Sequence, residues 1–436
     1  MTIHIYNAQL LHYLTEEDKG KRIHAVLSGT NNGDIKVDSH STMQSATNTI
    51  LESITQNHEI AGMTVYPEYI ADGAVVIDDT TGLIVDYGHS RTMLANYAHS
   101  ANEKQLSVNV HNYQDKLIMP GFIDTHVHYP QIDMIAAYGE QLLDWLNNYT
   151  FVTEANFSDP KVAHDTSKFF LNQLLANGTT SAMVFATSHP ESVTAFFEES
   201  ARLNTRMIAG NVLMDQNAPK NLCVATEQGI RDSQDLIDKW HNYGRQHFAI
   251  TPRFAITSTP KQLQMAGELY ASYDNVYLQT HLAENRDEVA LVRKLYPHHT
   301  DYLDVYADMG LLGRYSTLAH GIYLETAEYE LIRETKTQIA YCPTSNLFLG
   351  SGLFDLPKTL SYTGVSIATD VGEGTSLSML TTLSEAYKIQ QLQNNQLCAH
   401  QGLYQITLGN AQSLLLYDKI GNFMPNKEAD FVVIDA

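Results

Sequence analysis

The sequence predicts an α/β protein: a (β/α)8 TIM barrel with a small β-sandwich domain formed by the N- and C-terminal segments. Two observations predict this fold. Between about residue 118 and residue 415, eight short apolar runs alternate with longer segments of helical spacing, which is the pattern of parallel strands joined by crossover helices. Both ends of the chain also carry β-branched runs outside this alternation. Eight strands over about 300 residues suit a closed barrel better than the alternative, a doubly wound open sheet.

The domain boundaries follow from these patterns. Residues 1–117 are predicted to form the N-terminal β-rich part of the small domain, residues 118–415 the barrel, and residues 416–436 the C-terminal β segment of the small domain. Residues 27–60 are rich in Ser, Thr and Asn, which predicts a polar insert. Residues 73–88 contain two β-branched runs around Asp-Asp-Thr-Thr-Gly and therefore predict a hairpin. The run "ADFVVIDA" predicts a last strand at the C-terminal end.

The barrel elements are predicted from the spacing of apolar residues. Between the apolar runs, segments such as "SKFFLNQLLANG" and "PKQLQMAGELYASY" have apolar residues three and four positions apart, and the first ends on a glycine. The predicted strands lie in "LIMPGFIDTHVH", "TTSAMVFAT", "TRMIAGNVLM", "HFAITPRF", "VYLQTHLAE", "STLAHGIYL", "TQIAYCPTSN" and "VSIATD".

Composition and charge narrow the class of protein. The chain has 436 residues, is 44% hydrophobic and carries a net charge of −22, so we expect a sizeable core and no nucleic-acid partner. Its three cysteines include no CxxC pair, which excludes a thiolate metal site of that type and a disulfide framework. The N-terminus lacks a signal-peptide pattern and no run reaches ~18 apolar residues. We therefore expect a cytoplasmic protein without a membrane partner.

Histidines and carboxylates gather at the ends of the predicted strands, where active sites of such barrels lie. His126 and His128 stand two residues apart on the first strand, so their side chains point to the same side. The chain has 19 histidines, so one at a strand end is ordinary, but the coincidence at four strand ends favours a metal site. The other members, from strands five, six and eight, are His281, Glu284, His320 and Asp370.

The residue types indicate the chemistry of this site. Imidazole and carboxylate ligands fit zinc, or alternatively iron, better than magnesium. Zinc lowers the pKa of a bound water to roughly 7, so we predict hydrolytic attack on an electron-poor carbon. Glu284, three residues after His281, is predicted to move protons between the water and the leaving group. We expect Asp370 to orient the water and His320 to donate to the water or to the heteroatom under attack.

Longer motifs resemble the amidohydrolase superfamily, and within it the guanine deaminase branch, from about residue 65 to residue 436. The paired histidines are common to the superfamily, whereas "YPQ" after the first strand, "PRF" at the end of the fourth and "CPTSNLFLGSGLF" after the seventh are narrower. The resemblance implies a cytoplasmic hydrolase of purine catabolism, a homodimer, that converts guanine and water to xanthine and ammonia. It implies one zinc ion per subunit, with His320 beside the ion and Glu284 as general acid and base. The implied ligands are His126, His128, His281 and Asp370.

The resemblance also implies a purine pocket. Arg253 can donate to O6 of guanine, Gln131 can donate and accept at ring nitrogens, and Phe254 can pack against the purine. The sequence leaves open whether Trp145 lines the pocket or packs in the core. Glu373 stands where this branch tends to have a small neutral residue, and we expect its side chain to face solvent. The other implied pocket residues are shared with the metal site: His128, His281, Glu284 and Asp370.

Other functions use the same residues. The metal site would equally serve a deaminase of cytosine, of an adenosine derivative or of a triazine, and only the pocket residues decide among them. A two-metal hydantoinase or dihydroorotase would need a lysine at the end of the fourth strand, which ends "ITPRF". A non-catalytic scaffold on this fold would lack some of the expected ligands, and all are present.

Overall fold

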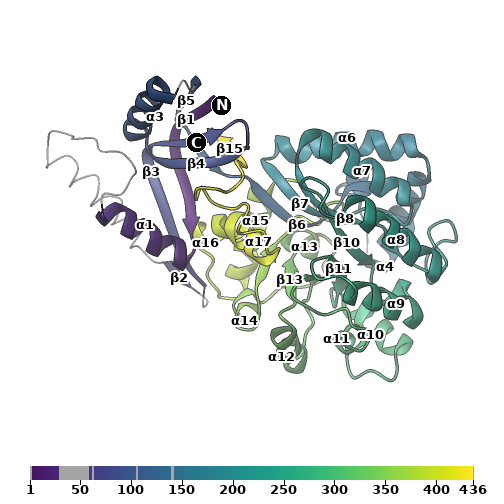
Figure 1. Cartoon of the computed structure of the whole chain (residues 1–436). Coiled ribbons are helices and arrows are strands. Elements are labelled where there is room, and N and C mark those ends of the chain that lie inside the picture. The colour runs from purple at the N-terminus through teal and green to yellow at the C-terminus, as the bar shows by residue number, and fades with distance from the viewer. Residues whose placement is uncertain (1, 29–57, 61–62, 105–106, 139–141, 436) are drawn as a thin grey trace. The chain divides into compact units, whose positions relative to one another are not determined.

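The computed structural model divides into two compact units (Figure 1). One comprises Met1–Phe122 and Cys398–Ala436, the other Ile123–Leu397. The sequence prediction placed the barrel at residues 118–415, whereas residues 398–415 group with the terminal unit. The structure describes residues 2–28, 58–60, 63–104, 107–138 and 142–435.

The terminal unit is built on a six-stranded sheet in the order β15-β5-β1-β3-β2, with β4 beside β3. The predicted hairpin is confirmed, since Asp78 lies opposite Leu83 and Gly82 adopts a left-handed φ of 69° in the turn. The last strand is also confirmed and pairs antiparallel with β5. Most of the polar insert predicted for residues 27–60 lies outside the described residues. The strands are β1 (Thr2–Leu14), β2 (His58–Ile60), β3 (Met63–Asp78), β4 (Leu83–His89), β5 (Ser107–Pro120) and β15 (Phe431–Ile434).

Two apolar clusters cover the two faces of this sheet. Ala74 and Val76 pack in the cluster that contains Met93 of α3, whereas Val75 packs in the cluster that contains Phe423. Neighbouring residues of a strand point to opposite faces, so β3 supplies both clusters. In the described residues the small domain is therefore one sheet, covered by a helix and by the segment around Phe423. The helices of this unit are α1 (Glu16–Ser28), α3 (Ser90–Lys104), α16 (Ala399–Tyr404), η5 (Gln405–Gly409) and α17 (Asn410–Ser413).

The other unit is a nearly closed barrel of parallel strands in the order β14-β13-β12-β11-β10-β8-β7-β6, with β9 beside β10. All eight predicted strands are present, and the predicted barrel class is confirmed. The strands are β6 (Phe122–His128), β7 (Thr179–Phe185), β8 (Arg206–Gly210), β9 (Val212–Leu213), β10 (His247–Pro252), β11 (Tyr277–Leu282), β12 (Ser316–His320), β13 (Gln338–Tyr341) and β14 (Val365–Ile367).

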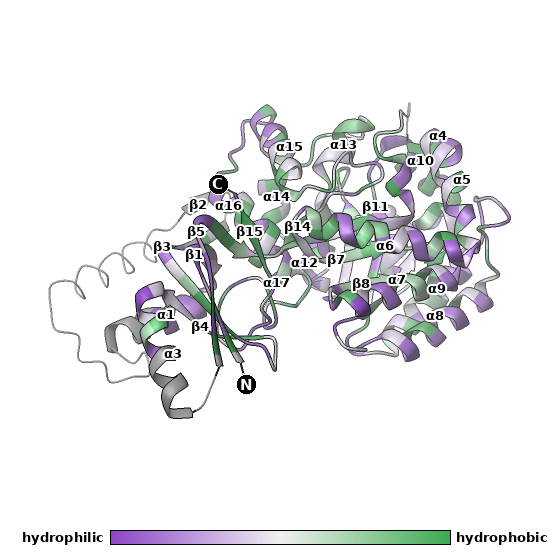
Figure 2. Cartoon of the chain, turned by 90° about the horizontal axis from the view of Figure 1, so that it is seen from above, coloured by the Kyte–Doolittle hydropathy of each residue, from purple (hydrophilic) through white to green (hydrophobic). Residues whose placement is uncertain are grey.

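Helices surround these strands, and α6 to α9 carry both hydrophilic and hydrophobic residues (Figure 2). The two predicted helical segments are confirmed as α6 and α9. Asp159 caps α6 by accepting from the Lys161 N–H, and Phe170, Leu171 and Leu174 are buried. None of the described helices combines the length and apolar character that a membrane crossing needs. The long helices are α6 (Pro160–Ala176), α7 (Pro190–Leu203), α8 (Thr226–Trp240), α9 (Pro260–Ala271), α10 (Arg286–Leu295), α12 (Thr326–Thr335) and α15 (Met379–Leu392). Shorter ones are η1 (Tyr129–Met134), α4 (Leu142–Trp145), η2 (Leu146–Thr150), α5 (Phe151–Glu154), η3 (Ala155–Ser158), η4 (Ala255–Thr257), α11 (Tyr302–Asp308), α13 (Pro343–Phe348) and α14 (Leu356–Leu360).

Backbone hydrogen bonds join the first barrel strand to the segment after the last one. The Asp370 N–H donates to the His126 carbonyl at 2.9 Å, and the His128 N–H donates to the Val371 carbonyl at 2.6 Å. Residues more than 240 positions apart therefore become neighbours at this end of the barrel, which is where the candidate site lies.

Candidate active site

Three imidazoles and one carboxylate meet at the ends of β6 and β11 and just after β14. Nε2 of His128 lies 3.3 Å from Nε2 of His126 and 3.3 Å from Nε2 of His281. Oδ1 of Asp370 lies 3.1 Å from Nε2 of His126 and 3.4 Å from Nε2 of His128. A tetrahedral ion with ligands at about 2.1 Å would separate its ligand atoms by about 3.4 Å. The spacing of these four ligand atoms therefore suits one metal ion of this kind.

Buried polar atoms without partners also indicate a cation. Among the described residues, neither carboxylate oxygen of Asp370 forms a hydrogen bond, although the residue is 1% exposed. A buried carboxylate left in this way is costly, and a bound cation would remove that cost. The Nδ1–H of His281 donates to the Arg253 carbonyl at 2.8 Å, which leaves the Nε2 lone pair for an ion. The donor set therefore fits a metal.

The surroundings give these groups the protonation states that ligands need. Burial lowers the pKa of His128 to about 3 and holds the pKa of His281 well below its ordinary value, with His126 adding to both effects. Burial by itself would raise the pKa of Asp370. The attraction of His126 and the closeness of the His126 and His128 rings outweigh burial and hold that pKa well below its ordinary value. Neutral imidazoles at His128 and His281 and an ionised carboxylate at Asp370 follow.

Three residues at the strand ends adopt the left-handed backbone conformation although they are not glycine. They are Ala283 (φ 45°), His320 (φ 72°) and Asp370 (φ 52°). This conformation costs roughly 1–2 kcal/mol for such residues, so the surrounding packing must impose it. Strained backbone of this kind gathers at functional sites.

Glu284 and His320 lie together beside the four ligands. Oε2 of Glu284 is 3.5 Å from Nε2 of His320, and Oε1 accepts from the Ser351 hydroxyl at 2.7 Å. Nε2 of His320 is also 3.7 Å from Oδ2 of Asp370. Burial, together with the charge of Asp370, raises the pKa of Glu284 to about 8. A carboxyl group with this pKa can take up and release a proton near neutral pH.

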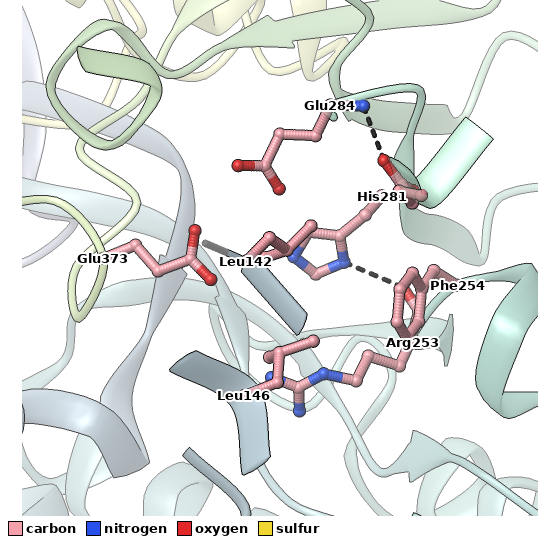
Figure 3. A pocket seen from close by; sticks show the side chains of 8 residues that line it. Leu142, Leu146, Arg253, Phe254, His281, Glu284 and Glu373 are labelled. Atoms are coloured by element: carbon pink, nitrogen blue, oxygen red, sulfur yellow. Dashed lines mark hydrogen bonds between the residues drawn. The ribbon is translucent and has the colours of Figure 1, made fainter. Parts of the chain in front are cut away.

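A small cavity opens beside this cluster (Figure 3). Arg253 and Phe254 line it together with His281 and Glu284, so these four predicted site residues share one space. The fork of an arginine, an aromatic ring and a proton-exchanging carboxyl suit a flat heterocycle with a polar edge. The other lining residues are Leu142, Leu146, Glu288 and Glu373.

Gln131 is buried close to this cavity but is not among the residues that line it. Its amide nitrogen donates to Oε1 of Glu154 at 2.9 Å, and its amide oxygen accepts from the Gly372 N–H at 3.3 Å. Glu154 also binds Arg253, whose Nη1 lies 3.0 Å and 2.8 Å from the two carboxylate oxygens. One buried carboxylate therefore connects Gln131 to the arginine.

Sequence reasoning missed Glu154. It is an acid in a short helical stretch whose neighbours Phe151 and Phe157 are buried. The signal in the sequence was an acidic residue between two phenylalanines of a helical stretch.

Glu288, Ser351 and Asn346 were also missed as partners of the site. Glu288 accepts the backbone N–H of Glu284 at 2.8 Å, and Oδ1 of Asn346 lies 2.9 Å from Nδ1 of His320. Asn346 and Ser351 both come from the "CPTSNLFLGSGLF" stretch. The resemblance to known proteins pointed to this stretch but implied no role for any of its residues. These partners hold Glu284 and His320 in place.

The expectation that Glu373 faces solvent is wrong. Its side chain is 7% exposed and lines the cavity. The reason is a tight turn after β14, in which the Gly374 N–H donates to the Asp370 carbonyl at 2.6 Å. A Cβ atom at Gly374 would lie 1.9 Å from the Thr369 carbonyl oxygen, so only glycine fits this turn. The turn directs Glu373 inward.

Trp145 has a core position rather than a pocket position. It is fully buried, and its indole N–H donates to the Ala137 carbonyl at 3.1 Å. Its neighbours Leu142 and Leu146 line the cavity instead.

Comparison with known proteins agrees with this geometry. Residues 117–436 match the model of the amidohydrolase family. The chain is 49% identical to guanine deaminase of Escherichia coli (strain K12) over 370 residues, which is 85% of this chain and 84% of that protein. The solved structure of E. coli guanine deaminase matches with a TM-score of 0.84 at 42% identity, over 99% of this chain and 89% of that one. Guanine deaminase from Bradyrhizobium japonicum matches with a TM-score of 0.84 at 32% identity, over 100% of this chain and 88% of that one. The chain belongs to the amidohydrolase family.

Proposed function

We propose that this chain is a zinc-dependent guanine deaminase, which hydrolyses guanine to xanthine and ammonia. The observation that carries the proposal is the cavity in which Arg253, Phe254 and Glu284 lie beside a cluster of metal-ligand type. The relatives named guanine deaminase support the same activity.

His126, His128, His281 and Asp370 would hold one zinc ion per subunit, which when bound makes hydroxide available from water at neutral pH. Iron is the alternative metal. The unpartnered carboxylate of Asp370 supports this assignment.

Arg253 and Phe254 would select the purine. Glu154 holds one end of the guanidinium, so the remaining N–H groups of Arg253 can donate to O6 of guanine. Phe254 is 4% exposed and can pack against the ring. Gln131 would reach a ring nitrogen by exchanging its bond with Gly372 for one with the substrate.

Glu284 would carry the protons. It takes one proton from the attacking water while the water oxygen bonds to C2, and delivers that proton to N3. It then takes the remaining proton from the new C2 hydroxyl and delivers it to the amino group, so that the C2–N bond breaks, a C2 carbonyl forms and ammonia leaves. Its pKa of about 8 supports both directions of transfer. His320 donates a hydrogen bond to the water or to the attacked heteroatom, and Asp370 orients the water.

Ammonia release from guanine, adenine, cytosine and hydantoin by zinc-loaded protein tests the proposal. Release from guanine alone, with xanthine appearing in equal amount, is expected. Release from another amine in place of guanine would overturn the guanine assignment and leave a deaminase of a different heterocycle. We also propose that the protein is cytoplasmic and forms a homodimer. Light scattering of the purified protein tests the oligomeric state.

A further inference from the structure

Glu373 is a buried carboxyl group at the cavity that the proposed mechanism does not use. It is 7% exposed, and its side chain points into the cavity that Arg253, Phe254 and Glu284 also line (Figure 3). Its Oε2 atom forms no hydrogen bond to any of the described residues. A buried polar atom that faces a cavity without a partner needs an explanation, and a ligand supplies one.

Protein groups around Glu373 do not provide that partner. The nearby cation, Arg253, already binds both carboxylate oxygens of Glu154, and within the described chain no ion pair joins it to Glu373. Burial and the negative charges of Glu284 and Asp370 raise the pKa of Glu373 well above its ordinary value. In either protonation state the carboxyl group keeps an oxygen that can accept a hydrogen bond. A donor on the bound substrate would therefore satisfy it.

The proposed orientation of guanine leaves its imidazole edge without an assigned protein partner. C2 faces the metal-ligand cluster, N3 faces Glu284, O6 faces Arg253 and the edge at N1 faces Gln131. The remaining polar edge of the purine is the imidazole ring, which carries one N–H. Glu373 enters the cavity from the side opposite Phe254 (Figure 3).

We propose that Glu373 is a substrate-selecting residue that accepts a hydrogen bond from the imidazole N–H of the purine. The inference rests on the proposed guanine deaminase function and adds a substrate class to it. Purines with a free imidazole N–H are the preferred substrates. Purines substituted at N7 or N9, nucleosides included, are disfavoured because they leave Glu373 buried without a donor.

Three substrates and three forms of the protein test the inference. The value of kcat/KM is measured for guanine, 7-methylguanine and 9-methylguanine with the unchanged protein, Glu373→Met and Glu373→Gln. Methionine has a similar length and no comparable acceptor, so it separates the hydrogen bond from the space that a methyl group needs. Glutamine keeps an acceptor oxygen and is the matched control. Bound zinc is measured for each form.

The unchanged protein should prefer guanine over both methylated purines. In Glu373→Met this preference should fall about tenfold to hundredfold, which is the range for a hydrogen bond to a buried charged or polar group, and Glu373→Gln should lie between the two. An equal preference in all three forms, with equal zinc, would overturn the inference and leave the deaminase proposal intact. Absence of guanine turnover by the unchanged, zinc-loaded protein would instead overturn the proposed function. If the methionine variant does not fold, a preference unchanged in Glu373→Gln and in Glu373→Ala overturns the inference equally.

Discussion

Replacement of Glu284 by glutamine isolates proton transfer from the rest of the site. Glutamine keeps the length of the side chain and one oxygen that can accept from the Ser351 hydroxyl. In the unchanged protein this hydroxyl donates to Oε1 of Glu284 at 2.7 Å. The backbone N–H of Glu284 is held by Glu288 in either form. The substitution therefore removes the exchangeable proton of a carboxyl group whose pKa is about 8, and little else.

The expected loss follows from the role of the group. General acid–base catalysis by one positioned side chain contributes typically a hundredfold to ten-thousandfold. Glu284 is assigned both the uptake and the delivery of protons, so we expect kcat of Glu284→Gln to fall about a thousandfold, or about 4 kcal/mol in the barrier. The KM for guanine should change no more than a few-fold, because Arg253 and Phe254 remain in place.

Steady-state xanthine formation gives kcat and KM, and metal analysis checks that zinc content is unchanged. Ser351→Ala is the matched control, since it removes only a hydrogen bond to the same carboxyl group and should lower kcat about tenfold. The reasoning is refuted if Glu284→Gln with full zinc keeps a tenth or more of the original kcat.

Three further predictions concern the metal, the arginine and the terminal unit. His281→Ala should lose most bound zinc and with it the activity. Replacement of the exposed His164 is the control and should lose neither. Metal analysis after dialysis compares the zinc content of the two variants. Glu154→Gln should raise KM for guanine about tenfold or more and lower thermal stability, because Arg253 is left buried without its charged partner; unchanged KM would contradict this. Glu68→Gln should lower the free energy of unfolding by about 3 kcal/mol at pH 7 and by much less near pH 2, as urea titrations across pH would measure.

The sign of the Glu68 effect follows from its surroundings. Burial alone would raise the pKa of this fully buried group, but the hydrogen bonds and charges of His12 at 3.0 Å and Arg22 at 2.9 Å lower it to about 2. A depressed pKa in the folded state stabilises the protein above the unfolded value of 4.5 and loses that effect as pH falls towards 2. The difference between the two proteins should therefore shrink over this window; a constant difference would mean that packing, not charge, is responsible.

The barrel and the four candidate ligands could be predicted from the sequence because each depends on local pattern. The spacing of apolar residues marks eight strands, and the barrel rule brings their ends to one face. His126, His128, His281 and Asp370 stand at or just after such ends, so their convergence required no knowledge of side-chain contacts. The same holds for Glu284, which follows β11 by two residues.

The tertiary structure alone decided how the cavity is completed. Glu154 holds Arg253 from 99 positions away, and the glycine turn after Asp370 directs Glu373 inward. Neither contact leaves a periodic trace in the sequence, because a buried ion pair and an inward turn depend on which distant backbone lies opposite. Strand ends follow from local periodicity and a general rule of barrel architecture, whereas these partners follow only from the packing of this particular chain.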